Sequence, residues 1–151
     1  MLAENKSGWV LLEYLKIKEN EIKEYDNVTG AYAIVNVKDR FLLGFNNWRK
    51  QWELPAGGIE DGETAREAAE RELSEETHQE NHNLIFKGLV KVMNPNGESR
   101  YQAVYQGFLE KLLPFEKKDG DEMDEILLWD LKEDIGYVDE CDLKILELFC
   151  L

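Results

Sequence analysis

The chain has 151 residues, of which 43% are hydrophobic, enough for one compact domain with a single core. Its 32 Asp and Glu residues outnumber 18 Lys and Arg residues, which gives a net charge of -14. A surface this acidic repels phosphate backbones and argues against duplex DNA or RNA as a partner. An anionic small molecule would need added positive charge at its site, and a divalent cation is the obvious source.

The sequence contains neither an apolar leader segment nor an apolar run of membrane-spanning length, so we expect a cytoplasmic protein with no membrane partner. Cys141 and Cys150 are too few for a disulfide scaffold and lie outside any zinc-type cluster, so we expect reduced thiols. We expect one domain over residues 1–151, with residues 1–28 as an extension of unassigned structure. A hairpin in this extension is compatible with a homodimer.

The first third of the chain reads as strands and turns, judged from apolar runs and turn-forming residues. The predicted elements are a strand over 9–17 (with a helix as the alternative), a turn or short polar strand over 18–27, a buried strand over 31–37, a hairpin turn over 38–39, a returning strand over 40–45 and a polar loop over 46–51. Residues 52–56 then lead to a backbone break at Gly57 and Gly58.

The remainder adds two helices to further strands. The predicted elements are a helix over 64–77, a strand over 84–92, a turn over 94–97, a strand over 101–109, a polar loop over 112–124, a short strand over 126–129 and a closing helix over 139–149. Strands and helices alternate without regular βαβ repeats. This order favours an α/β (α+β) domain with a mixed sheet between helices.

Three carboxylates on the first predicted helix are the first candidates for chemistry. On a helical wheel Glu72, Glu75 and Glu76 fall within one arc of about 100°, on the side of several small alanines. Like charges at this spacing destabilise an isolated helix, so the arrangement favours a bound cation. Oxygen ligands alone suit Mg²⁺ or Mn²⁺. A solvated acidic face is the alternative in a chain so rich in glutamate.

The residues that flank these glutamates favour the cation. The segment over residues 57–79 resembles the box of the Nudix hydrolase family in an ungapped register. Seven of nine specified positions agree, and they are Gly57, Glu63, Arg71, Glu72, Leu73, Glu75 and Glu76. His78 and Gln79 depart, because the family has a glycine and an aliphatic residue there. The glycine normally ends the helix with a positive φ, so His78 puts that cap geometry in doubt but removes no metal ligand.

The resemblance implies an α/β/α sandwich and a role for each matching residue. Glu72, Glu75 and Glu76 are implied ligands of Mg²⁺ or Mn²⁺, with the carbonyl of Ala56 as a further ligand. Arg71 and Glu63 are implied to orient the loop and the helix, and Arg71 is placed to steer Glu75. Gly57 and Gly58 let the loop backbone approach metal and phosphates.

A carboxylate must also take a proton from the attacking water. The resemblance allows this base to lie in the box or in a later acidic loop. The candidates are therefore Glu75, Glu122 and Glu125. For the last two, a simple surface charge is the alternative interpretation.

The substrate is expected to be a nucleoside diphosphate derivative cut at its phosphoanhydride bond. The stretch over residues 54–58 resembles that of ADP-ribose pyrophosphatases, and Pro95 lies sixteen residues beyond Gln79, as that branch tends to have. ADP-ribose or a nucleotide sugar is therefore favoured. The alternatives are a triphosphate pyrophosphohydrolase that removes oxidised nucleotides, and a non-catalytic Nudix-like domain that binds a nucleotide and regulates a partner.

Aromatic and basic residues near the box are candidates for substrate binding. Trp48 and Tyr101 offer surfaces on which a base can stack, and Arg49 offers a charge for a phosphate. Trp52 is expected to pack in the core instead. His78 and His82 are expected at the surface without a role.

Overall fold

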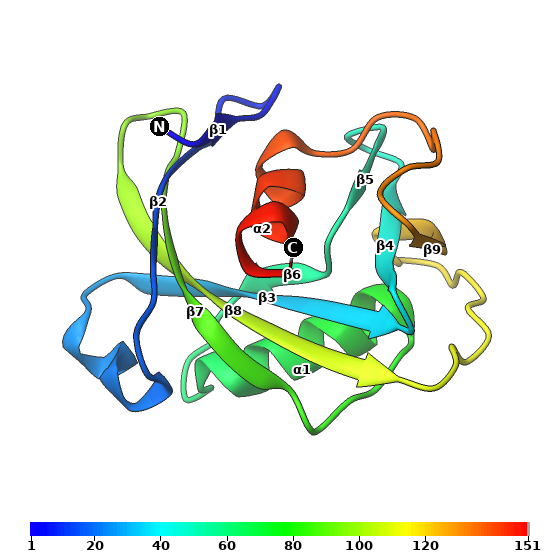
Figure 1. Ribbon diagram of the computed structural model, residues 1–151, viewed down its shortest axis with the longest axis horizontal. Coiled ribbons are helices and arrows are strands. Elements are labelled where there is room, and N and C mark those ends of the chain that lie inside the picture. The colour runs from blue at the N-terminus through cyan, green and yellow to red at the C-terminus, as the bar shows by residue number, and fades with distance from the viewer. Residues whose placement is uncertain (151) are drawn as a thin grey trace.

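A mixed sheet of nine strands separates two helices in the computed structural model, which describes residues 1–150 (Figure 1). The strands are β1 (Ala3–Glu4), β2 (Val10–Leu15), β3 (Val28–Val37), β4 (Arg40–Asn46), β5 (Gln51–Glu53), β6 (Ala56–Gly58), β7 (Ile85–Met93), β8 (Ser99–Leu109) and β9 (Met123–Trp129). The helices are the 3₁₀ helix η1 (Glu19–Glu24) and the α-helices α1 (Ala65–Thr77) and α2 (Glu140–Cys150). The predicted mixed α+β fold is thereby confirmed.

The sheet runs in the order β1-β2-β7-β8-β3-β4-β5, with β6 paired to β3 and β9 paired to β4. Only β3 and β8 pair in parallel among the named strands of residues 1–150, and the other strand pairs are antiparallel. No helix within these residues is both long and apolar enough to cross a bilayer. The long strands β3 and β8 therefore lie side by side in the middle of the sheet.

The two faces of β3 carry side chains of different size. Ala31, Ala33 and Val35 pack into the cluster beneath α1, whereas Ile34 packs into the cluster beneath α2. This alternation follows from the period of two along a strand. Small residues on one face meet the small alanines of α1, so helix and sheet lie close together.

Helix α1 has a strong signal at each end. Thr64 caps its N-terminus, where the hydroxyl accepts from the Glu67 N–H at 3.1 Å and the Glu67 carboxylate accepts from the Thr64 N–H at 2.9 Å. At the C-terminus, His78 adopts the left-handed conformation with a φ of 60°. The cap geometry put in doubt by the missing glycine is therefore kept.

Several predicted boundaries move. Residues 18–27 were predicted as a turn or polar strand, but they contain η1, because Glu19 pairs with Arg66 of α1 at 2.7 Å and accepts from the Tyr105 hydroxyl at 2.9 Å. Such contacts over long sequence separations leave no local pattern. The strand predicted over 31–37 begins at Val28, and the one predicted over 126–129 begins at Met123. The segment over 9–17 contains the strand β2 and no helix.

The N-terminal extension contributes an edge of the sheet. β1 and β2 form an antiparallel hairpin, and β2 pairs with β7 over residues 10–15 (Figure 1). This hairpin, whose strand at Ala3–Glu4 was not predicted from the sequence, is packed on the same chain. Its part in a homodimer stays a prediction.

Helix α2 is joined to the short segment between β5 and β6 that leads into the candidate site. Asp142 in its first turn is buried, and its carboxylate accepts from the Leu54 N–H at 2.9 Å. Burial raises the pKa of Asp142 well above the usual carboxyl range, and the neighbouring Asp139 raises it further. A buried carboxyl thus fixes the segment that precedes Gly57.

This burial predicts a pH-dependent stability. Because the pKa of Asp142 is raised in the folded state, the folded protein holds a proton that the unfolded chain releases above about pH 4. The free energy of unfolding should therefore fall as the pH rises from about 4, the pKa of the unfolded chain, towards the raised pKa of Asp142 in the folded protein. Asp142→Asn keeps an acceptor for Leu54 and should lose less stability than the wild type between pH 5 and pH 8, measured by urea unfolding. Asp119→Asn, at an exposed position, is the control, and identical pH profiles for all three proteins would contradict the assignment.

Candidate active site

Gly57 brings the loop backbone against the glutamates of α1. The pairing of β6 with β3 places Gly57 opposite Ala31, on the side of the sheet where α1 packs. A Cβ atom at residue 57 would lie 2.2 Å from Oε1 of Glu72, closer than any real contact. Only glycine therefore permits the Glu72 carboxylate to lie on this loop.

Arg71 holds the loop and the helix together through its guanidinium group. It donates to both carboxylate oxygens of Glu63, at 2.8 and 3.1 Å, and to the carbonyl of Gly58 at 2.7 Å. It also donates to Glu72 at 2.7 Å and to Glu75 at 3.1 Å. The negative charge around it pulls the pKa of Arg71 far above its usual value, so the side chain stays charged.

The three box glutamates differ in burial. Glu76 is 6% exposed and accepts from the Ala56 N–H at 2.7 Å. Glu72 is partly buried, and the side chain of Glu75 is 58% exposed. Burial raises the pKa of Glu76 well above the usual range, and burial likewise raises the pKa of Glu72. Both carboxyls therefore stand where a nearby positive charge would favour ionisation.

Glu122 reaches the same place from the loop before β9. Its carboxyl raises the pKa of both Glu72 and Glu76, and it lies within hydrogen-bonding reach of Glu76. Asn46 donates to it at 3.1 Å and Arg49 donates to it at 3.2 Å. Glu125 lies instead on β9, opposite Phe45, and is exposed. Of the two later candidates for the base, Glu122 is the one near the box.

The donors present fit a hard divalent cation. Glu72 and Glu76 supply carboxylate oxygens from one helix, Glu122 adds a further carboxylate beside them, and nitrogen or sulfur groups are absent from this set. Within residues 1–150, no three acidic, histidine or cysteine side chains stand ready in coordination geometry. Glu72 is turned towards Arg71 and Glu76 towards the Ala56 N–H. A bound ion would therefore compete with these two internal contacts.

A cavity of about 480 Å³ opens beside Gly57 and Gly58, on the α2 side of the sheet. This volume lies in the range of small-molecule sites. Its aromatic wall is formed by Trp9 and Tyr32, and its polar wall by Arg100 and other residues, including Asn5, Arg49, Glu53, Gln102 and Asp139. The guanidinium of Arg100 lies 5.5 Å from the Trp9 ring centre, a cation–π contact.

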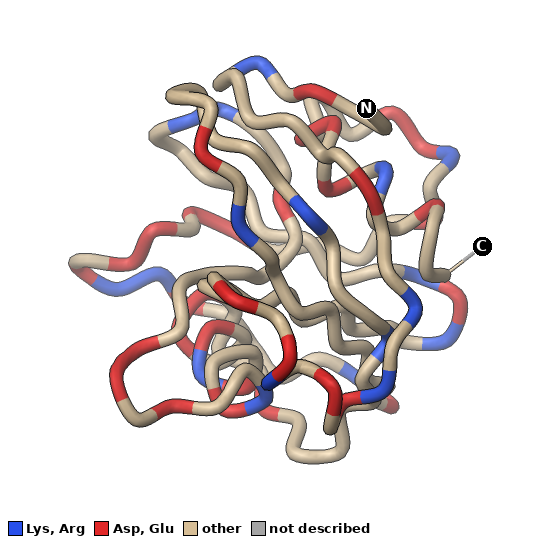
Figure 2. Tube along the Cα trace, turned by 90° about the vertical axis from the view of Figure 1, so that its left-hand side faces the viewer, with Lys and Arg blue, Asp and Glu red and all other residues tan. Residues whose placement is uncertain are grey.

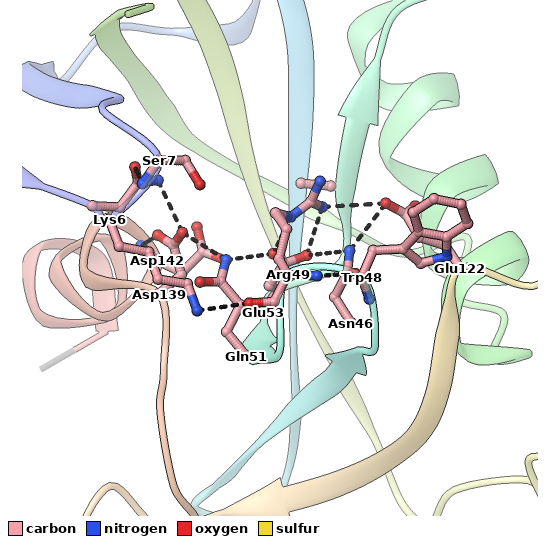
Figure 3. Close-up of polar contacts among 12 residues, drawn as sticks. Lys6, Ser7, Asn46, Trp48, Arg49, Gln51, Glu53, Glu122, Asp139 and Asp142 are labelled. Atoms are coloured by element: carbon pink, nitrogen blue, oxygen red, sulfur yellow. Dashed lines mark hydrogen bonds and ion pairs between the residues drawn. The ribbon is translucent and has the colours of Figure 1, made fainter.

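A chain of polar contacts links the wall of the cavity to Glu122 (Figure 3). Asp139 accepts from Asn5 at 2.9 Å and from Gln51 at 3.1 Å, and Gln51 also donates to Glu53 at 2.6 Å. Glu53 in turn accepts twice from Arg49, at 2.7 and 2.9 Å, and Arg49 donates to Glu122. These contacts thus connect Asn5, between β1 and β2, with Glu122 in the loop before β9.

The three residues predicted to bind substrate lie in different places. Arg49 lines the cavity, but its guanidinium is paired with Glu53 and Glu122. Trp48 is 87% exposed at the edge of a second hollow that also includes Glu122. Tyr101 packs against Tyr25 in the cluster on the α1 side, away from the cavity wall. Trp52 is 5% exposed, so the prediction that it packs in the core is confirmed.

Sequence reasoning missed Arg100 and Gln102, which flank Tyr101 on β8 and line the cavity. The period of two along the strand was a usable signal, since it places residues 100 and 102 on the face opposite Tyr101. Trp9 and Asn5 were missed because their hairpin joins the site only through sheet pairing. His82 is exposed as expected, but the predicted surface residue His78 is only 24% exposed in its side chain and contacts Asp121 at 3.1 Å.

Acidic residues are spread along the visible trace and interspersed with basic ones (Figure 2). The acidic residues noted in the sequence are therefore distributed along the chain and are not confined to one tail.

Comparison with known proteins agrees with this geometry. The sequence profile of the NUDIX domain matches residues 24–147, which is most of the chain. A segment of 26 residues is 73% identical to the RNA pyrophosphohydrolase of Dinoroseobacter shibae. This segment amounts to 17% of the chain and only 16% of that protein.

Two solved structures share the fold at low sequence identity. The pyrophosphohydrolase BsRppH of Bacillus subtilis superposes with a TM-score of 0.67 at 21% identity, over 88% of this chain and 79% of that chain. The NUDIX domain of NrtR from Shewanella oneidensis, solved with ADP ribose, gives 0.64 at 14% identity, over 87% and 95%. With the profile match over residues 24–147 and the paired loop and helix described above, the chain belongs to the Nudix hydrolase family.

Proposed function

We propose that this Nudix protein uses Mg²⁺ or Mn²⁺ to hydrolyse the phosphoanhydride bond of a nucleoside diphosphate derivative of the ADP-ribose or nucleotide-sugar type. One observation carries the proposal. The carboxyls of Glu72, Glu76 and Glu122 gather beside a glycine loop that forms the edge of a nucleoside-sized cavity. A diphosphate at that edge would lie between the carboxylates and the cavity.

The protein's own groups have separate tasks. Gly57 and Gly58 leave the loop backbone open to a phosphate. Glu72, Glu75 and Glu76, with the Ala56 carbonyl, would hold the cation, and Arg71 keeps the first two carboxylates in place. When bound, the cation supplies charge for the diphosphate and lowers the pKa of a water molecule. Glu122, with Glu75 as the alternative, would accept the proton, because it lies at the site while held by Asn46 and Arg49.

The cavity is the proposed place of the nucleoside. The ring of Trp9 offers a stacking surface, and Arg100 offers a cation whose position over that ring is already set. Support for an ADP-ribose-like substrate comes from the NrtR domain, which was solved with ADP ribose and covers most of both chains. The resemblance of residues 54–58 to the corresponding stretch of ADP-ribose pyrophosphatases supports the same substrate. Trp48 remains a proposed second contact at the exposed rim.

A triphosphate substrate is the second candidate. Two similar proteins are named as a pyrophosphohydrolase and an RNA pyrophosphohydrolase. A net charge of -14 opposes a long RNA more strongly than a single nucleotide, because repulsion adds along the phosphate backbone. Of the triphosphates, a free nucleotide is therefore favoured over an RNA end.

An activity screen tests the proposal. The protein should release AMP from ADP-ribose with Mg²⁺ or Mn²⁺ and lose this activity in excess EDTA, measured by chromatography of the products. Nucleoside triphosphates and a short 5′-triphosphate RNA should be cut with at least about tenfold lower kcat/KM, a difference of about 1.4 kcal/mol in barrier. Preferential release of pyrophosphate from a triphosphate would select the second candidate. A complete lack of turnover would support the non-catalytic nucleotide-binding domain and contradict both.

Glu76→Gln separates charge from fold. The amide still offers an oxygen to the Ala56 N–H but removes a buried charge, so the metal-free variant should melt at or above the wild-type temperature. Its kcat should fall at least about 100-fold, equal to about 2.7 kcal/mol. The rise in Tm that Mn²⁺ gives the wild type should be reduced.

Glu80→Gln, at an exposed position beyond the same helix, is the matched control and should behave as wild type. Full activity of Glu76→Gln would remove this residue from the proposed site. A fall in both activity and metal-free Tm would mean instead that the carboxylate serves the fold.

A further inference from the structure

The two positions at which the chain departs from the Nudix box both contact one loop. His78 and Gln79 stand where the family pattern has a glycine and an aliphatic residue, immediately after α1. The loop runs over residues 110–122 and connects β8 to β9 without helix or strand. It ends in Glu122, the acidic residue that reaches the box glutamates. The departures therefore concern the segment that delivers a proposed site residue.

Gln79 pairs with the near end of this loop. Its side chain is 1% exposed, and its Nε2 donates to the Leu113 carbonyl at 2.8 Å while its Oε1 accepts from the Leu113 N–H at 2.7 Å. Nε2 also donates to the Thr77 carbonyl at 3.0 Å, so the amide is fully used. An aliphatic side chain in its place would leave the N–H and the carbonyl of Leu113 without these partners.

His78 contacts the far end of the loop. Its Nε2 lies 3.1 Å from the carboxylate of Asp121, which also accepts from the Lys118 N–H at 2.9 Å. The imidazole ring lies against the Phe115 ring, with centroids 4.5 Å apart. A glycine would fit the left-handed backbone of this position more easily, but it offers neither contact. The side chain is therefore the part of His78 that the loop uses.

The two contacts together fix the approach of Glu122. Leu113 and Asp121 bracket the loop, and Asp121 immediately precedes Glu122 in the chain. From the other side, Asn46 and Arg49 donate to the Glu122 carboxylate. If the loop lost its contacts with both Gln79 and His78, the Glu122 carboxylate could move away from Glu76, since the remaining contacts of Glu122 are partly exposed.

We propose that His78 and Gln79 are positioning residues, which clamp the loop over residues 110–122 so that the Glu122 carboxylate lies at the cation site beside Glu76. This clamp rests on the proposed function for the role of Glu122. It acts through the loop, and neither residue touches substrate. It also gives the two departures from the box a common purpose.

The variants His78→Gly and Gln79→Leu restore the family residues. The first removes the contact with Asp121, and the second removes the contacts with Leu113. Each variant should lower kcat about tenfold and change KM less than about twofold, because the base is misplaced while the cavity is intact. The affinity for Mn²⁺ alone, titrated by electron paramagnetic resonance, should fall about threefold or more. Hydrogen exchange measured by NMR should show faster exchange at the Leu113 amide in Gln79→Leu, with the amides of α1 unchanged.

Three further variants separate positioning from general stability. His78→Gln carries an amide nitrogen that can reach the position of the imidazole Nε2 and donate to Asp121, so it should retain more activity than His78→Gly. His82→Ala removes the exposed histidine and should leave kcat unchanged. Gln106→Leu removes another buried glutamine, bonded to Asn36 at 2.8 Å, and should lower Tm without lowering kcat.

The decisive comparison uses Glu122→Gln as the background. If the clamp works through Glu122, adding His78→Gly or Gln79→Leu to Glu122→Gln should cost little further kcat or Mn²⁺ affinity. Additive losses, or unchanged kcat and Mn²⁺ affinity in both single variants, would overturn the clamp. If the wild type hydrolyses none of the substrates, the proposed function fails. The clamp is then decided by the Mn²⁺ titrations and the exchange rates alone.

Discussion

The close approach of the Glu72 carboxylate to the backbone of Gly57 is the contact on which the rest of the site depends. It requires a glycine, a loop held flat by the pairing of β6 with β3, and a helix brought near by small residues on both surfaces. It also collects negative charge in one place, because Glu76 and Glu122 lie beside it. Within the protein, the guanidinium of Arg71 neutralises part of this negative charge. A hard divalent cation would neutralise the remaining negative charge at the point where a diphosphate can enter.

Local signals were sufficient where the structure is local. Helix α1 was predicted over 64–77 from an apolar stripe of alanines and Leu73, a signal that acts within a few residues, and it is found over residues 65–77 with Thr64 as its cap. The strands around Ile34 and Val104 were predicted from apolar runs, and both lie in the buried sheet. The resemblance to the family box also implied that Arg71 and Glu63 are partners, and their side chains are in contact. Covalent spacing along one helix and one turn determines such distances.

The parts that escaped prediction depend on contacts between distant segments. The 3₁₀ helix η1 is held by Arg66 and Tyr105, and Trp9 of the cavity wall comes from a hairpin that pairs with the sheet through β7. His78 was assigned no role, because its partner Asp121 is 43 residues away. Nothing in the residues next to His78 or Gln79 indicates which loop will lie against them. The site is thus partly a property of the box and partly a property of how the sheet brings other segments to it.

The most direct test of this account is the anomalous diffraction of a crystal of the wild-type protein soaked in Mn²⁺. The account predicts a peak within about 2.5 Å of carboxylate oxygens of Glu72 and Glu76, with Glu122 turned towards the same ion. The hydrogen bond of Glu72 to Arg71 or that of Glu76 to Ala56 should lengthen as the ion takes its place. Unchanged internal pairs with no peak between these carboxylates, at a Mn²⁺ concentration that saturates activity, would contradict it.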